Sequence, residues 1–263
     1  MRKLIAIDLD GTLLRSDSTI SAESEAYLQQ AVADGHVLTV VTGRSWASSL
    51  RYVRQLGISS PYIVHNGAWI TDVSAAILQL SPIAADAARD FWLYCNEKQI
   101  ACTFTTTRGL YINRDDSHSI ENHLAHEGTS PEVKTDRPPE ADEPLLAICI
   151  NSRDSETYLS VYGQLSKRFG QRLNIYRVGY NMINVAAPGV SKGRALEYLA
   201  SHLSIPMDDV IAFGDNHNDV DMLQKAGTGV AMEGSDPETL AVADIVAPAN
   251  NQDGVIAVLR QLI

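Results

Sequence analysis

The sequence Asp8-Leu9-Asp10-Gly11-Thr12 closes an apolar run of strand length, Lys3–Leu9. The arrangement recurs late in the chain, where Asp215-Asn216-His217-Asn218-Asp219 follows the apolar run Val210–Phe213 and a glycine. In an open parallel sheet, ligands bind beyond the carboxyl ends of the strands, so we expect both clusters at one edge. Converging carboxylates repel one another unless a divalent cation holds them or one keeps a proton. Three or four of them make the hard-oxygen site that Mg²⁺ prefers.

Two further segments have the chemistry of a phosphate site. Thr42-Gly43-Arg44 follows the β-branched run Val37–Val41 and offers a hydroxyl, backbone N–H groups near a helix start, and a cation. Lys192 begins a predicted helix, where a cation is unfavourable unless an anion binds beside it. Taken singly, Thr42-Gly43 also fits an ordinary turn and Lys192 a surface lysine. All four segments in this order are harder to attribute to chance.

The first and last thirds of the chain alternate strand-like and helix-like segments, which predicts right-handed βαβ units and a Rossmann-like parallel sheet. The middle third instead contains neighbouring strands that imply antiparallel pairing, together with a polar loop over residues 128–144. We therefore predict an α/β fold with a core domain of residues 1–82 and 188–263 and an inserted α+β domain of residues 83–187. Proline-containing connections mark both boundaries.

Composition excludes several classes of protein. The 263 residues include 21 basic and 32 acidic side chains, and the net charge of −11 argues against non-specific nucleic-acid binding. An anionic substrate must then be held by local positive charge. No apolar stretch is long enough to predict a membrane span. The three cysteines lack a CxxC spacing, which favours free core thiols and a cytoplasmic protein over disulfides or metal ligands.

The sequence resembles the haloacid dehalogenase-like (HAD) superfamily of phosphatases. The four segments already described carry the resemblance, with Asp8–Leu14, Val40–Arg44, Gly189–Gly193 and Gly214–Asp219 as the matching stretches. His65-Asn66-Gly67-Ala68 is similar to a stretch of the Cof-type subfamily. By position and element order, the inserted domain resembles a type IIB cap. Relatives often carry an acidic residue where Asn184 stands, just before the second boundary.

The resemblance implies a phosphoric monoester hydrolase (EC 3.1.3.-) and assigns roles to residues. Asp8 would be the nucleophile that forms an aspartyl-phosphate, and Asp10 the acid and base. Mg²⁺ would be held by the Asp8 carboxylate, the Asp10 backbone carbonyl and Asp215, with Asp219 nearby or acting through water. Thr42, Gly43, Lys192 and Asn218 would bind the phosphoryl oxygens.

The inserted domain would act as a lid that excludes water and large partners, which favours small phosphorylated metabolites, with sugar phosphates as the family's common class. Candidate substrate contacts are Arg44 in the core and Arg114, His118 and Tyr180 in the cap. His118, His123 and His126 fit either a transition-metal site or a polar helix face. A phosphomutase and a non-catalytic sensor of phosphorylated metabolites are the alternative functions. We expect a monomer or small homo-oligomer.

Overall fold

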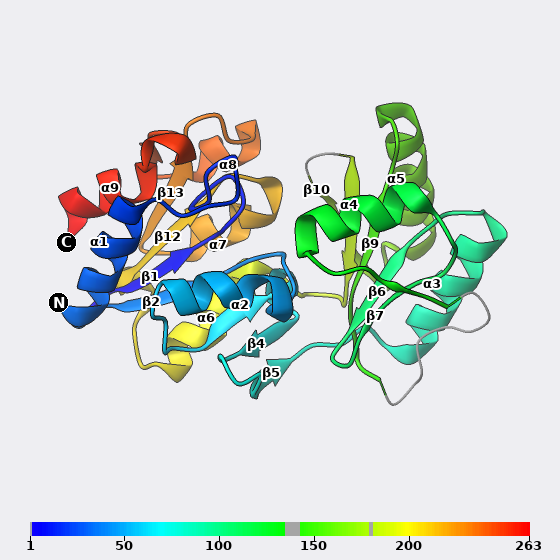
Figure 1. Ribbon diagram of the computed structural model, residues 1–263, viewed down its shortest axis with the longest axis horizontal. Helices are drawn as coiled ribbons and strands as arrows, with labels where there is room; N and C mark the ends of the chain where they lie inside the picture. Colours follow the sequence, from blue (N-terminus) through cyan, green and yellow to red (C-terminus); the bar gives the residue numbers. More distant parts are fainter. Residues whose placement is uncertain (1, 135–142, 179–180) are drawn as a thin grey trace. The chain divides into compact units, whose positions relative to one another are not determined.

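The computed structural model of the chain describes residues 2–134, 143–178 and 181–263 (Figure 1). The chain divides into two compact units, and each has its own sheet. One unit consists of Met1–Gln79 together with Ser191–Ile263, and the other is the inserted segment Leu80–Val190. The N-terminal and C-terminal parts of the chain therefore build a single core unit around one sheet.

The core unit contains a five-stranded parallel sheet. Its strands are β1 (Leu4–Ile7), β2 (Val37–Val40), β12 (Val210–Gly214), β13 (Thr228–Met232) and β14 (Ile245–Ala247). The spatial order is β14-β13-β12-β1-β2, so β1 pairs with β2 on one side and with β12 on the other. Along the chain, β2 therefore follows β1 on one side of it, and the later strand β12 lies on its other side. Such a reversal of strand order opens a ligand-binding crevice at the carboxyl ends of the two central strands.

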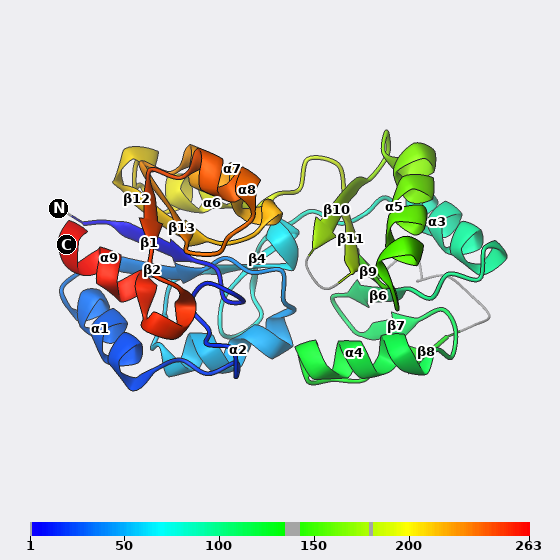
Figure 2. The same ribbon diagram turned by 90° about the horizontal axis from the view of Figure 1, so that it is seen from above.

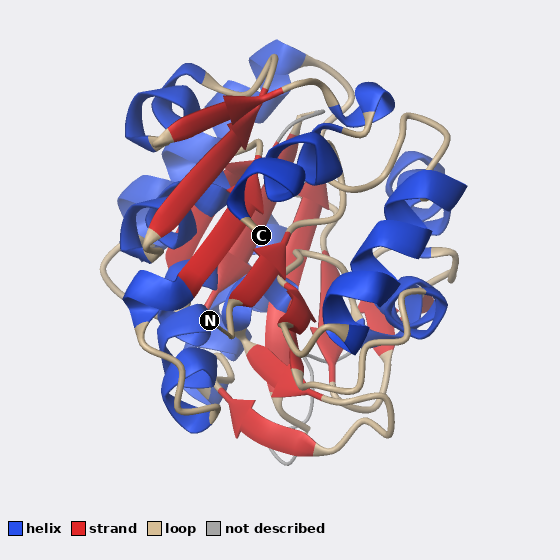
Figure 3. Cartoon of the chain, turned by 90° about the vertical axis from the view of Figure 1, so that its left-hand side faces the viewer, coloured by secondary structure: helices blue, strands red, loops and turns tan. Residues whose placement is uncertain are grey.

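Helices cover both faces of this sheet (Figure 3). Helices α1 (Ala22–Ala33), α2 (Trp46–Gln55) and α9 (Gly254–Leu262) lie on one side, and α6 (Lys192–His202), α7 (Val220–Lys225) and α8 (Pro237–Val242) on the other (Figure 2). Because both faces are covered, every residue of β1, β2 and β12 is buried. The hydroxyls of Ser21, Ser45 and Ser191 cap the helices that follow them.

A small antiparallel sheet adjoins the edge of β2. It contains β3 (Tyr62–Val64), β4 (Trp69–Thr71) and β5 (Ile77–Leu80), and the 3-10 turn His65–Gly67 joins the first two strands. Thr42 donates its backbone N–H to the carbonyl of Ile63 at 2.9 Å, which attaches β3 to the main sheet. Strands β4 and β5 match no pattern that the sequence analysis identified.

The described residues of the inserted unit form a mixed sheet with three helices. Its strand order is β10 (Asn174–Val178), β11 (Met182–Ala186), β9 (Leu145–Asn151), β6 (Thr103–Thr106), β7 (Leu110–Ile112) and β8 (Glu132–Val133). Helices α3 (Ala85–Glu97) and α5 (Ser155–Phe169) pack together through Phe91, Tyr94 and Phe169, and α4 (Ser117–Glu127) lies across the sheet from them (Figure 2). Strand β8 corrects the prediction of an irregular loop over 128–144, where two residues pair with β7. The predicted α/β fold with an inserted α+β domain is confirmed.

Candidate active site

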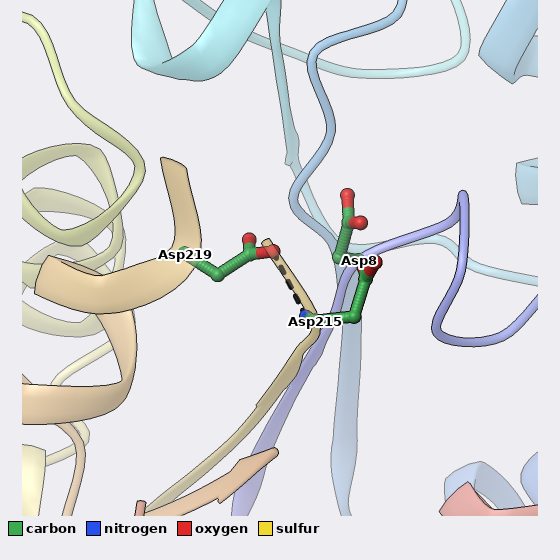
Figure 4. Close-up of side chains that lie close together, drawn as sticks. All are labelled: Asp8, Asp215 and Asp219. Carbon is green, nitrogen blue, oxygen red and sulfur yellow. Dashed lines mark hydrogen bonds between the residues drawn. The ribbon is translucent and has the colours of Figure 1, made fainter. Parts of the chain in front are cut away.

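Three aspartates converge at the carboxyl ends of β1 and β12. Asp8 follows β1, Asp215 follows β12, and Asp219 closes the turn before α7. One carboxylate oxygen from each lies within 4.8 Å of the others (Figure 4). The Asp215 backbone N–H donates to Asp219 Oδ2 at 3.1 Å, the bond drawn as a dashed line. The two acidic segments that are 200 residues apart in the chain therefore meet, as expected for the central crevice of a parallel sheet.

Lys192 lies inside this cluster rather than on the surface. Its Nζ donates to Asp8 Oδ1 at 2.7 Å and to Asp219 Oδ1 at 2.6 Å. The side chain is 1% exposed, and it starts α6. Burial opposes a charged ammonium, but Asp219 and Asp8 outweigh it and raise the pKa of Lys192. The chain's own carboxylates thus supply the anions that a cation at a helix N-terminus requires.

The charge of the cluster suits a divalent cation. Three carboxylates and one ammonium leave two formal negative charges in a buried space. Burial first, then neighbouring carboxylates, raise the pKa of Asp8 well above its usual range, although Lys192 opposes the shift. Burial and Asp219 likewise raise the pKa of Asp215 to about 7. A hard divalent cation would balance these charges, and all the side-chain donors are the carboxylate oxygens that such a cation prefers.

A glycine lets the two loops of the cluster approach each other. Gly11 has a φ of +77°, and a Cβ at this position would lie 2.3 Å from Asp215 Oδ2. Both the left-handed backbone and the contact exclude a side chain. The neighbouring Thr12 donates its hydroxyl to Asp215 Oδ1 at 2.9 Å. Thr12 is a contact of the aspartate cluster that the sequence prediction did not include, although it stands within the first quoted stretch.

Asp10 lies in a different environment from Asp8. The Arg44 guanidinium binds both of its oxygens, with Nε 2.7 Å from Oδ2 and Nη2 2.6 Å from Oδ1. The Asp10 side chain is 55% exposed, whereas that of Arg44 is 8% exposed. The Arg44 guanidinium carbon also lies 5.6 Å from the centre of the Tyr52 ring. Arg44, predicted as a contact for phosphate or substrate, is thus placed in a bidentate ion pair with Asp10.

The other predicted phosphate ligands also belong to the core unit. Val41 donates its backbone N–H to Ile7 at 2.9 Å, so Thr42 lies beside the end of β1. The Thr42 hydroxyl accepts from the Arg44 backbone N–H at 3.1 Å. Asn218 donates its side-chain amide to Asn66 Oδ1 at 2.9 Å, and Asn66 in turn lies close to Gly43.

The predicted contacts of the inserted unit do not form one group. Arg114 donates to the Gln99 side chain at 2.8 Å. His118 lies 3.0 Å from the Asn122 amide and lines a polar hollow of about 540 Å³ beside α3 and α5. Tyr180 is outside the described residues, and so is the side chain of His126. Among the described side chains, the aspartate cluster of the core is the one group able to hold a metal ion.

The sequence pattern of the haloacid dehalogenase-like hydrolases matches residues 5–259, nearly the whole chain. The chain belongs to this family. The predicted family membership is confirmed. The protein is a phosphatase that acts on small phosphorylated molecules. No helix in the described part of the chain is both long and apolar enough to span a bilayer.

Several relatives are similar to this chain over most of their length. The 5-amino-6-(5-phospho-D-ribitylamino)uracil phosphatase YitU of Bacillus subtilis is 27% identical, over 98% of this chain and 96% of its own. The pyridoxal phosphate phosphatase YbhA of Escherichia coli is 29% identical, over 96% of each chain. The chain spans only 45% of the chloroplastic endoribonuclease YBEY of Arabidopsis thaliana, with 29% identity. A HAD-like hydrolase structure from Bacteroides thetaiotaomicron covers all of both chains with a TM-score of 0.88 and 21% identity, which supports the fold.

Proposed function

We propose that the chain is a Mg²⁺-dependent phosphatase that works through an aspartyl-phosphate on Asp8. The observation that carries the proposal is the convergence of three carboxylates at the sheet's central crevice, two of which bind one buried lysine. Lys192 binds Asp8 through Oδ1 and so leaves Oδ2 for attack on phosphorus. Asp8, Asp215 and Asp219, with the Asp10 carbonyl, would hold the metal. Bound Mg²⁺ would supply positive charge against the phosphoryl oxygens.

In the first half of the reaction, Asp8 Oδ2 attacks phosphorus and the bond to the ester oxygen breaks. Asp10, protonated on an oxygen that has given up its contact with Arg44, gives its proton to the leaving oxygen, which departs as an alcohol. In the second half, the Asp10 carboxylate takes a proton from water, the resulting oxygen attacks phosphorus, and inorganic phosphate leaves Asp8. Thr42, Gly43, Asn218 and Lys192 hold the non-bridging oxygens. The net reaction consumes one water for each ester.

We further infer that residues 83–187 form the cap and that the substrate is a phosphorylated sugar or sugar alcohol. The name of the relative YitU describes a substrate with a phosphorylated ribityl chain, which has this chemistry. YbhA is named for pyridoxal phosphate, in which the phosphate esterifies a hydroxymethyl group on an aromatic ring, and represents the competing class. A panel of sugar, polyol and aromatic phosphates, ranked by kcat/KM, distinguishes the two.

The decisive experiment measures phosphate release from p-nitrophenyl phosphate and from this panel. Turnover should require Mg²⁺, stop with EDTA and return when Mg²⁺ is restored. A phosphomutase would instead return the phosphoryl group to a sugar, so the same samples are assayed for isomeric sugar phosphates. Binding of panel members without release of phosphate from any of them would contradict the proposal and indicate a sensor.

A further inference from the structure

The turn His65–Gly67, between β3 and β4, has an unusual backbone. All three residues are buried and have positive φ values, 51° for His65, 55° for Asn66 and 102° for Gly67. Two of them are not glycine, so the turn is held in a conformation that L-residues adopt at a cost. Such strain persists where the surroundings impose it, and it is concentrated at functional sites.

The backbone of this turn contacts two of the predicted phosphate-binding segments. His65 donates its N–H to the Arg44 carbonyl and Asn66 donates to the Thr42 carbonyl, both at 3.0 Å. On its other side, a Cβ on Gly67 would lie 2.4 Å from the Ser191 carbonyl, directly before Lys192. The turn therefore fixes the segment that carries Thr42 against the start of α6.

The Asn66 side chain reaches a third segment. It is 5% exposed, and its Oδ1 accepts from Asn218 Nδ2 at 2.9 Å. A side-chain amide has two N–H donors. Because one donor of Asn218 is used on Asn66, that bond restrains the orientation of the amide and with it the direction of the second donor. Asn66 also adjoins Gly43, since a Cβ there would lie 3.1 Å from Asn66 Oδ1.

We propose that Asn66 is a positioning residue that orients the Asn218 amide toward the phosphoryl group. The inference rests on the proposed phosphatase function. Asparagine suits this position because it tolerates left-handed backbone better than most residues and also carries the acceptor that Asn218 needs. The Asn66 side chain acts on the reaction through Asn218, whereas the contact with the Thr42 segment is made by the backbone of the turn and remains in a glycine variant.

The variant Asn66→Gly tests the side chain without adding backbone strain. We expect kcat on p-nitrophenyl phosphate to fall about tenfold or more, less than the 10²–10³ typical of a lost direct donor to an oxyanion. The melting temperature should stay close to that of the unmodified protein. Ser204→Gly is the matched control, because Ser204 has a φ of 54° in the same unit and an exposed side chain. Its activity should be unchanged.

A double-substitution cycle tests whether Asn66 acts through Asn218. We expect Asn66→Gly combined with Asn218→Ala to be no slower than Asn218→Ala alone. Independent, multiplicative losses would overturn the proposal, and so would an Asn66→Gly variant as active as the unmodified protein. Asn66→Ala separates strain from positioning: it should lower the melting temperature, while its kcat matches that of the glycine variant.

The proposed function and this inference fail in different ways. If the unmodified protein releases phosphate and Asn66→Gly is equally active, only the role of Asn66 is overturned. If the unmodified protein releases phosphate from no member of the substrate panel, both are overturned.

Discussion

Asp8 and Asp10 are two residues apart in sequence, yet the protein gives them opposite surroundings. Asp8 is 5% exposed and lies among Lys192, Asp215 and Asp219. Asp10 is half-exposed and is held by one guanidinium through two hydrogen bonds. A compact ammonium can be shared between two carboxylates, whereas a planar guanidinium fixes one carboxylate in one orientation. The comparison shows how residues of one type acquire different chemistry from their partners.

The largest effect is expected at the buried member of the pair. Asp8→Asn removes the proposed nucleophile while preserving its shape, so turnover should fall by at least about 10³-fold. The melting temperature of the metal-free protein should not fall, because a buried negative charge is removed. Phosphate release and thermal unfolding measure the two outcomes. Asp17→Asn, at an exposed carboxylate, is the control and should be fully active. Activity of Asp8→Asn within tenfold of normal would eliminate the nucleophile assignment.

The second prediction concerns the exposed member. Asp10→Asn cannot protonate a leaving alkoxide, so turnover of an alkyl phosphate should fall about 10²–10⁴-fold. p-Nitrophenolate leaves without a proton, so phosphorylation of Asp8 by that substrate should persist while hydrolysis slows. The expected signature is a burst of one p-nitrophenolate per active site, with a phosphorylated protein in the mass spectrum. Equal losses on both substrates, with no burst, would assign Asp10 another role.

A smaller effect is expected at Arg44, which holds Asp10. Arg44→Ala should lower kcat about tenfold on an alkyl phosphate and less on p-nitrophenyl phosphate, because only the former needs a correctly oriented acid. Arg44→Lys should not restore activity, since an ammonium cannot reproduce the bidentate contact. Arg51→Ala is the control, because Arg51 stacks on the same Tyr52 ring 4.4 Å from its centre. The same loss on both substrates would show that Arg44 acts mainly on the phosphoryl group.

The smallest expected effect concerns the pH dependence of stability at Asp215, which lies beside Asp8 in the buried cluster. The raised pKa of Asp215, about 7, means that the folded metal-free protein keeps a proton that the unfolded chain loses near pH 4. The free energy of unfolding should therefore decrease as pH rises from about 4 to about 7. Asp215→Asn lacks this penalty and should be more stable than the unmodified protein above pH 7, by about 1–3 kcal/mol.

Urea unfolding in EDTA at pH 5, 6, 7 and 8 measures this difference. With saturating Mg²⁺ the order should reverse, because the unmodified protein binds the ion more tightly. A difference between the two proteins that is independent of pH would contradict the assignment to Asp215. Asp17→Asn again serves as the control, because its carboxylate is exposed.

The features predictable from sequence were those that depend on neighbouring residues. A β-branched run and a polar cluster directly after a strand are local signals, and such signals predicted the elements next to Asp8, Thr42, Lys192 and Asp215. The rule that ligands bind beyond the carboxyl ends of parallel strands then predicted that the clusters lie at a single edge of the sheet. No such rule pairs one side chain with another. The contacts of Arg44 with Asp10 and of Asn66 with Asn218 therefore appeared only in three dimensions.

The inserted unit was the less predictable part for the same reason. Its helices followed the apolar pattern, but the two-residue strand β8 pairs with a strand twenty residues away and has no periodic signal. Arg114 and His118 were chosen as charged or polar residues near loop and helix starts, and each binds a neighbour in its own unit. Substrate contacts depend on the shape of a ligand, which residue type alone does not specify.

Lys192 has a consequence for the order in which the working molecule assembles. Its buried ammonium is a counter-ion that is part of the polypeptide, so one of the cluster's three negative charges is already balanced when the chain folds. Folding need not wait for an inorganic ion, unlike that of a zinc finger, whose apo chain stays unfolded. A divalent metal would then bind reversibly to a protein that is already folded. Chelators should therefore stop activity reversibly without unfolding the protein.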